Sequence, residues 1–593
     1  MLVVCNTTFI NEKKLKLVCV LYHTFVMLLL EVFQSNKLLS DLQYYSASSS
    51  GRHDWRVKLM TSFTIRTNVQ YSRGVKRQMT MGRPRQLFFL YKISRPTTTS
   101  VSSTRLQRRM VASLKEEKEA FVTGHTGSTP WEVLLVCSSA PVGFAFYQIL
   151  SANVKQTMWR SILYEALTLW LPMVVCQTNL LYPWGVAIIA VQLLCIIFMA
   201  CGISLQPRHG SEQPQTTTAS GQHQRIDYLT IYRSSILYLT FVAILAVDFH
   251  VFPRRFAKTE VSGYGLMDVG AASFVLSAGF VSSKARRRSP DAPTSYNIRR
   301  YALHTLPLVA IGFIRFITNK GLDYQEHVSE YGVHWNFFFT LGVMAFITPL
   351  VPLRTPTWYL PVLLLTLYQI CLGKLGWQEY IETAPRTCND YFTTQPISRM
   401  FCDIIAANRE GILGCVGYFT INLLGEFIGF SFLWNKGSAS LQGGGTTLYS
   451  KGLFLLSGIL WVIHWILVHF LNIPVSRRST NASFCVWVVA HNVLLLAMIQ
   501  AGTSLGKQLQ HQKGRQLNLP PVMEKVNRYG LIMFLVANLL TGLVNLTVPT
   551  LRIGDTVAFL IVFGYICAIS IAALLVDLVY QKFTPLKWKK KSE

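Results

Sequence analysis

The sequence predicts an all-α fold, a polytopic membrane helix bundle of about 13 transmembrane helices behind a basic N-terminal extension that we expect to be disordered. Two observations support this. Only 14% of the 593 residues are charged and 51% are hydrophobic, whereas a soluble domain carries roughly 25% charged residues. The apolar residues also cluster in runs of about 20, the length with which a helix crosses a hydrocarbon core while satisfying its own backbone.

The first 109 residues differ in composition from the rest. They contain 18 Lys and Arg against 4 Asp and Glu, which accounts for half of the net charge of +28. Residues 46–109 are rich in Ser, Thr and Arg and have little to bury, so we expect disorder there. We therefore divide the chain into a basic extension, 1–109, and a multi-pass transmembrane domain, 110–593, and expect the functional protein to start near Met110. A genuine basic leader is the alternative.

Thirteen candidate spans follow the extension. If they alternate across the membrane, the loops on the side of the C-terminus hold 23 Lys and Arg and the opposite loops hold 11. The richer side should be cytoplasmic, which puts the C-terminus in the cytoplasm and accounts for the positive charge without a nucleic-acid partner. The spans lie at 133–150, 160–181, 183–205, 229–248, 264–283, 300–318, 333–351, 357–373, 411–431, 452–472, 483–503, 530–548 and 555–578.

The last four residues, Lys-Lys-Ser-Glu at 590–593, match the dilysine pattern for retrieval to the endoplasmic reticulum. Such a signal is an address that a receptor reads on the cytoplasmic side, where the charge rule independently places this end. A basic cluster that attracts anionic lipid is the simpler alternative.

The far-side loop after the fourth span is an exception to the charge rule. Residues 248–260 carry Arg254, Arg255 and Lys258 where cations are disfavoured, together with Asp248 and Glu260. One interpretation is an ion-paired structural turn. The other is an anion site in which the arginines bind phosphate, while Asp248 receives a hydroxyl proton and Lys258 faces developing negative charge.

Other polar residues inside the apolar spans are candidates by default, because exposing them to lipid is costly. For most we favour pairing inside the bundle, such as Asp268 with Arg233 or Arg315. Arg477 and Arg478 form a second basic spot on the far side. The candidates within spans are Glu165, Arg233, Asp268, Arg315, Glu426, His464, His469 and His491.

The twelve cysteines show no zinc-binding spacing, and no Glu-x-x-His pair occurs, so we expect no metal site. Cys388 and Cys402 fall in one long loop, 374–410. They could form a disulfide if that loop faces an oxidising lumen.

Several of these motifs resemble one known family. The run VDFHVFPRRFAK at 247–258, followed by GLMDVG at 265–270 and SFV at 273–275, is similar to the glycosylphosphatidylinositol (GPI) inositol acyltransferases, the PIG-W family. KEAFV at 118–122, NREGI at 408–412 and SRR at 476–478 add to the resemblance. It extends from about Met110 to the C-terminus, covers all the predicted spans and leaves out 1–109.

The resemblance implies an activity for residues 110–593. Members of the family move a fatty acyl group, typically palmitoyl, from acyl-CoA to the inositol 2-hydroxyl of glucosaminyl-phosphatidylinositol, on the luminal side of the endoplasmic reticulum membrane. The catalytic acidic and basic pair proposed for the family falls on Asp248 and Lys258. We expect substrate binding by Arg254, Arg255, Asp268, Arg477 and Arg478. Acyl-CoA, the acceptor lipid and membrane lipids are then the partners, with acyl-CoA as co-substrate and no metal or other cofactor.

Two alternatives belong to other classes. Many spans with buried charges suit a secondary transporter, although no convincing internal repeat is visible. A membrane-bound O-acyltransferase built on an intramembrane histidine would use His464 or His491 instead of Asp248.

Overall fold

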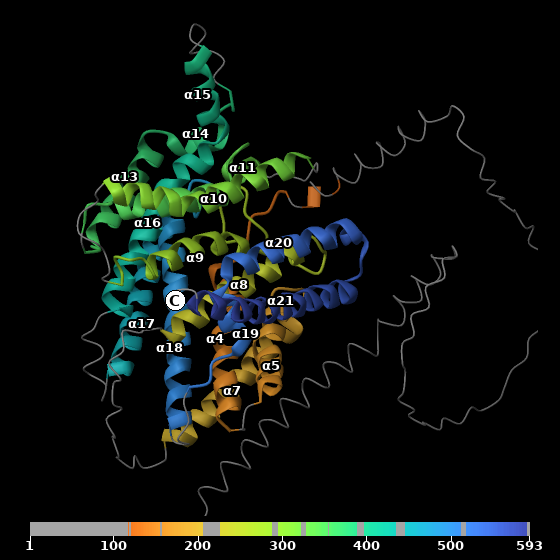
Figure 1. Cartoon of the computed structure of the whole chain (residues 1–593). Helices are drawn as coiled ribbons and strands as arrows, with labels where there is room; N and C mark the ends of the chain where they lie inside the picture. The colour runs from red at the N-terminus through yellow and green to blue at the C-terminus, as the bar shows by residue number, and fades with distance from the viewer. Residues whose placement is uncertain are drawn as a thin grey trace, which may run out of the picture. The chain divides into compact units, whose positions relative to one another are not determined.

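The computed structural model describes residues 117, 120–121, 123–153, 157–204, 226–286, 295–321, 328–353, 355–387, 396–434, 445–511 and 517–589. Across these ranges the regular structure is helical, and β pairing is limited to an isolated bridge between Ser128 and Tyr264. The all-α prediction is confirmed (Figure 1). The extension 1–109 and residues 590–593 lie outside the described ranges, so what we expect of them stays a prediction.

Nine helices in the described part of the chain are long and apolar enough to cross a membrane. A tenth span results if α13 (Tyr359–Lys374) and α14 (Trp377–Thr383), which meet at a bend of 65°, form one segment. The polytopic character is confirmed, but the count of 13 is not. The nine are α4 (Pro130–Asn153), α7 (Val186–Ser204), α8 (Asp227–Ala246), α10 (Ser295–Gly321), α16 (Arg409–Ile428), α17 (Gly445–Trp465), α18 (Ala482–His511), α20 (Gly530–Thr547) and α21 (Asp555–Lys589).

The other predicted spans correspond to shorter or interrupted helices. Two apolar helices, α9 (Leu266–Phe280) and α12 (Phe337–Leu350), have 15 and 14 residues. The span predicted at 160–181 is divided into α5 (Met158–Glu165), the π-helix η1 (Ala166–Trp170) and α6 (Leu171–Cys176). The remaining short elements are η2 (Leu181–Gly185), η3 (Arg254–Phe256), α11 (Val328–Tyr331), α15 (Pro396–Ala407), η4 (Gly429–Leu433), η6 (Ile466–Phe470), α19 (Pro521–Arg528) and η7 (Thr550–Arg552).

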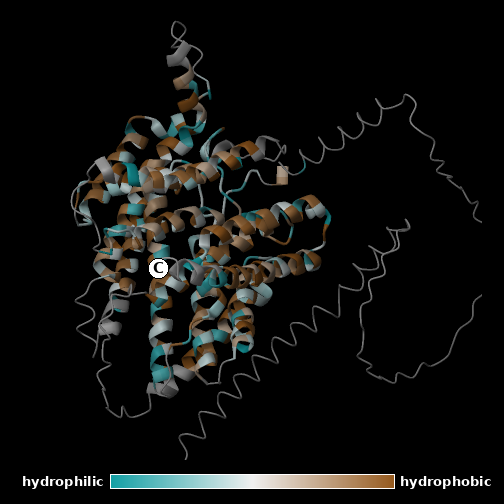
Figure 2. Cartoon of the chain, viewed as in Figure 1, coloured by the Kyte–Doolittle hydropathy of each residue, from teal (hydrophilic) through white to brown (hydrophobic). Residues whose placement is uncertain are grey.

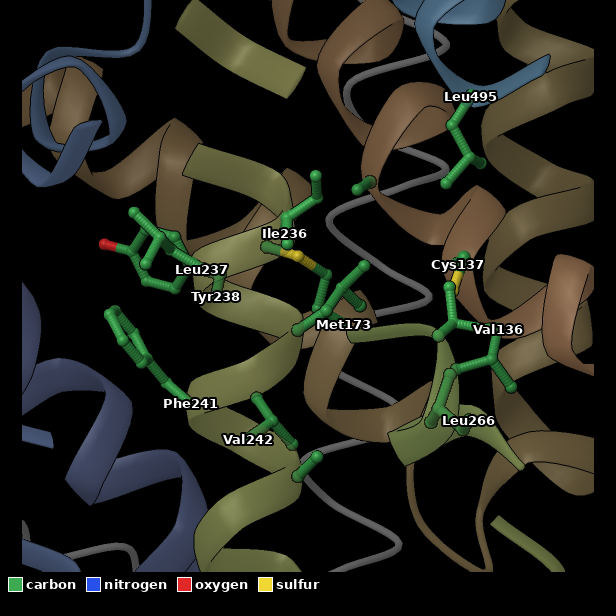
Figure 3. Close-up of a cluster of buried hydrophobic side chains, with 14 of the residues drawn as sticks. Val136, Cys137, Met173, Ile236, Leu237, Tyr238, Phe241, Val242, Leu266 and Leu495 are labelled. Carbon is green, nitrogen blue, oxygen red and sulfur yellow. The ribbon is translucent and has the colours of Figure 1, made fainter. Parts of the chain in front are cut away.

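The helices divide into buried and exposed sets. α18 is the most buried of the nine and packs against α17 and α4, whereas α10, α17 and α20 leave most of their apolar surface exposed, as expected of lipid-facing helices. α20 and α21 are apolar along most of their lengths (Figure 2). The core cluster in Figure 3 joins side chains from four helices and the α9 N-terminus: Val136, Cys137, Met173, Ile236, Leu237, Tyr238, Phe241, Val242, Leu266 and Leu495.

Helices α8 and α9 set the position of the candidate site. They pack against each other, and the segment 247–265 joins the C-terminal end of α8 to the N-terminal end of α9. Asp248, Lys258 and Asp268 therefore lie near one end of this helix pair, and the segment 281–286 that follows α9 lies toward the other.

Candidate functional site

The turn after α8 is built around the guanidinium of Arg254. Its nitrogens donate hydrogen bonds to the carbonyl oxygens of Val247 (2.9 Å), Phe249 (3.0 Å) and Phe252 (3.0 and 3.1 Å). The ring of Phe121 lies 4.0 Å from the guanidinium carbon. Burial lowers the pKa of Arg254 to about 10, although nearby Asp248 opposes that shift. Arg254 therefore stabilises the backbone of the turn, as the structural interpretation of this loop predicts.

Arg255 forms an ion pair with Glu132. Its Nε lies 2.9 Å from Glu132 Oε1, at the start of α4, and the hydroxyl of Tyr182 donates to the same oxygen at 2.8 Å. The Arg255 side chain remains 41% exposed. It can therefore contact a ligand without losing its place in the turn.

The two proposed catalytic residues each have a partner from a distant segment. Asn545 at the end of α20 donates to Asp248 Oδ2 at 2.7 Å. Lys258 Nζ lies 2.5 Å from Glu330 Oε1 in α11, with the lysine side chain 37% exposed and the glutamate 14%. Both lie in the described part of the chain, and no ion pair joins Lys258 to Asp248. Sequence reasoning missed Glu330 and Asn545, because only the folded chain brings them to this loop.

Asp268 and Arg477 form a buried ion pair. Arg477 Nε lies 2.7 Å from Asp268 Oδ1, and the other carboxylate oxygen accepts from the backbone N–H (3.1 Å) and the hydroxyl (2.8 Å) of Thr259. The expectation that Asp268 pairs inside the bundle holds, but its partner is Arg477 and not Arg233 or Arg315. Since both side chains are buried against each other, direct substrate binding by either one would require the pair to open.

Arg478 belongs to a separate cluster. It contacts Glu410 Oε1 at 3.0 Å, and Arg386 contacts the same oxygen at 2.7 Å. The neighbouring Asn408 accepts from the backbone N–H groups of His334 and Trp335. In this structure the motif at 408–412 therefore ties together three loops at this end of the bundle.

The two histidines of the alternative enzyme class have different surroundings. His464 Nδ1 lies 3.1 Å from the carbonyl oxygen of Ser483, so this nitrogen carries the proton and Nε2 accepts from the hydroxyl of Tyr264 at 2.9 Å. His491 is fully buried, with no hydrogen-bond partner at either ring nitrogen. Neither arrangement is that of a general base exposed to substrate.

A cavity of about 460 Å³ lies toward the other end of α8 and α9. Apolar side chains such as Leu237, Phe274 and Phe534 form most of its lining, and Arg233, Lys284 and Glu426 contribute charge. Lys284 Nζ also donates to the carbonyl oxygens of Thr348 and Val351, both at 2.9 Å.

Two further expectations concern metals and cysteines. Within the described ranges, no three His, Cys, Asp or Glu side chains converge as a metal site would require. Cys402 is disulfide-bonded, and Cys388, its expected partner, lies outside the described residues. The pairing of Cys388 with Cys402 therefore stays a prediction.

Comparison with known proteins gives a consistent match. The family model of GWT1 matches residues 114–576. The chain is 33% identical over 521 residues to GPI-anchored wall transfer protein 1 of Aspergillus oryzae, covering 79% of this chain and 98% of that protein. It is 33% identical to the protein of the same name from Emericella nidulans (78% and 97% covered) and 31% identical to that from Saccharomyces cerevisiae (78% and 98% covered).

Proposed function

Because the chain belongs to the GWT1 family of GPI inositol acyltransferases, we propose that it transfers a fatty acyl group, typically palmitoyl, from acyl-CoA to the inositol 2-hydroxyl of glucosaminyl-phosphatidylinositol. The chain is a multi-pass membrane protein with a role in GPI-anchor biosynthesis. The proposed location is the endoplasmic reticulum membrane, with the C-terminus in the cytoplasm and the segment 247–265 in the lumen.

The apolar cavity beside α8 and α9 is the observation that carries the proposal. A long acyl chain needs an apolar compartment, and this cavity adjoins the two helices that lead to Asp248 and Lys258. Leu237 in its lining precedes Asp248 by 11 residues, which corresponds to about 16 Å along a helix. An acyl chain that extends from the segment 247–265 into the cavity would leave its thioester beside the charged residues.

The contacts of Asp248 and Lys258 suit two separate roles. Asp248, oriented by Asn545, would receive the proton of the attacking inositol hydroxyl. Lys258, held by Glu330, would donate a hydrogen bond to the thioester oxygen as negative charge develops on it. Because the two groups do not neutralise each other in an ion pair, each keeps its charge for its own role in the proposed reaction.

Among the proposed anion-binding residues, Arg255 is best placed for a substrate phosphate. Its side chain is 41% exposed and has a fork of donors suited to a phosphate. Arg254 is occupied by carbonyl oxygens, while Arg477 and Arg478 are occupied by carboxylates. We propose that these three act mainly by shaping the loops around the substrate.

A direct assay tests the proposed function. Purified full-length chain in detergent is incubated with labelled palmitoyl-CoA and glucosaminyl-phosphatidylinositol, and the lipid products are separated. We expect a labelled, inositol-acylated lipid that requires both substrates. A properly folded chain that forms no such product would refute the proposal, and a product acylated elsewhere than the inositol would refute the proposed acceptor.

A further inference from the structure

The environment of Lys258 extends well beyond its ion pair. An ammonium group has three N–H donors, and Glu330 accepts one of them at 2.5 Å. The next residue, Thr259, donates both its backbone N–H and its hydroxyl to Asp268. The Lys258 side chain is therefore held by Glu330 of α11, and the backbone of the next residue is held by Asp268 of α9.

Arg477 interacts electrostatically with both carboxylates. It pairs with Asp268 at 2.7 Å, and its guanidinium carbon lies 5.9 Å from the ring of Tyr331, the residue after Glu330. Burial disfavours the charged form of Arg477, but the charges of Asp268 and Glu330 outweigh it and raise its pKa above the usual value. Arg477 therefore stays cationic next to α9, which carries Asp268, and α11, which carries Glu330.

Backbone contacts hold the same segments together. The N–H of Gly263 donates to the carbonyl oxygen of Val475 at 2.8 Å, and the hydroxyl of Ser476 donates to that of Val261 at 2.8 Å. A Cβ at Gly265 would lie 2.4 Å from Asp268 Oδ2, so a side chain there would displace the carboxylate. The segment 257–265 is thus docked on the residues around Arg477 at several points.

We propose that Glu330, Asp268 and Arg477 are positioning residues that hold the Lys258 ammonium within hydrogen-bond reach of the position of the thioester oxygen. This inference rests on the proposed function. In that reaction the inositol oxygen bonds to the thioester carbon, the carbon–sulfur bond breaks, and the hydroxyl proton ends on the thiol of coenzyme A. Lys258 keeps its own protons and stabilises the oxyanion. A displaced ammonium would weaken this stabilisation without changing substrate binding to the same extent.

Glu330→Gln is the most informative variant, because the amide keeps the size of the side chain and removes its charge. In purified full-length chain we expect kcat to fall about 10-fold to 100-fold, as for loss of a charged hydrogen bond, while KM for both substrates changes less than about threefold. Glu330→Asp should recover part of kcat. Asp268→Asn should also lower kcat more than it raises KM.

Glu524→Gln is the matched control, since Glu524 pairs with Arg528 in α19 and has no place in the proposed site. Its kcat should equal that of the original chain. If Glu330→Gln leaves kcat unchanged, whether or not KM rises, the positioning role is refuted. If the original chain itself transfers no acyl group, the proposed function fails instead, so the two failures are distinguishable.

Discussion

The two ends of the α8 and α9 pair differ in how their charges are held. In and around the segment 247–265, charged groups are matched by partners from distant parts of the chain: Asp248 with Asn545, Lys258 with Glu330, Asp268 with Arg477. Toward the other end, the lining is mostly apolar and surrounds a cavity of about 460 Å³. The end at segment 247–265 therefore holds charged groups in fixed positions, and the opposite end contains an apolar cavity.

We infer from this difference that the two ends have separate functions, catalysis at one and acyl-chain binding at the other. Fixed, paired charges are what a reaction needs for stabilising charge that develops in the transition state. An apolar space beside them suits a chain that contributes binding but takes no part in the chemistry. Substitutions among the charged residues at one end should therefore lower stability or catalytic rate, whereas substitutions in the cavity lining should change which acyl chains are accepted.

The largest expected effect is on stability, at the buried ion pair. Arg477→Ala leaves the Asp268 carboxylate buried without its cation, and breaking such a pair costs about 3–5 kcal/mol. We expect a clearly lower Tm in detergent. Arg160→Ala, which removes an exposed arginine at the start of α5, should change the free energy of unfolding by only about 0–1 kcal/mol. Equal Tm values for both variants would contradict the assigned role of the buried pair.

The next effect is on catalysis, at Lys258. Lys258→Met keeps most of the length of the side chain but removes its donors, so kcat should fall about 10²-fold to 10³-fold, as when an oxyanion donor is lost. Steady-state acyl-transfer kinetics provide the measurement. Lys525→Met, which removes another ion-paired lysine, should leave kcat near that of the original chain. Comparable activity in both variants would exclude Lys258 from the chemistry.

A smaller effect is expected at Asn545, which orients Asp248. Asn545→Ala removes a hydrogen bond to a carboxylate, worth about 1.5–3 kcal/mol, and should lower kcat/KM by roughly 10-fold to 100-fold. Asn538→Ala is the control on the same helix, because Asn538 is exposed and donates to a carbonyl oxygen one turn away. If the two variants have the same kcat/KM, Asp248 does not depend on Asn545.

The smallest effect is expected at Arg254. Arg254→Lys keeps the charge but cannot reach the carbonyl oxygens of Val247, Phe249 and Phe252 together. We expect a loss of about 1–2 kcal/mol in the free energy of unfolding, visible in a thermal melt, with KM nearly unchanged. A large rise in KM with an unchanged Tm would instead identify Arg254 as a phosphate-binding residue.

Local sequence predicted the helical, polytopic character of the chain, but neither the number of helices long enough to cross a membrane nor the partners of the charged residues. Hydropathy finds an apolar run such as 530–548 because burial in lipid constrains every residue in it. It cannot say whether a run forms one helix, and the span predicted at 160–181 is interrupted by a π-helix. The 15-residue helix α9 shows that an apolar run need not be long enough to cross a membrane unaided.

The candidate site was predictable only in part, for a related reason. The cations of 254–258 stood out because they break the charge rule, which is a local property of the sequence. Their partners are not local: Glu330 lies 72 residues from Lys258, and Asn545 lies 297 residues from Asp248. Nothing in the pattern around Asp268 distinguishes Arg477 from Arg233 as its partner, since that choice depends on how the loops pack.

One measurement tests the division between the two ends most directly: the acyl-chain-length profile of transfer, from short to long acyl-CoA donors. Ala278→Phe, which narrows the cavity, should shift the preference to shorter chains and retain full rates with them. Lys258→Met should lower the rate for every chain length by the same factor, and Leu543→Phe, on the exposed face of α20, should change nothing. A profile that shifts with Lys258→Met, or stays unchanged with Ala278→Phe, would contradict the assignment of chemistry to one end and of the acyl chain to the other.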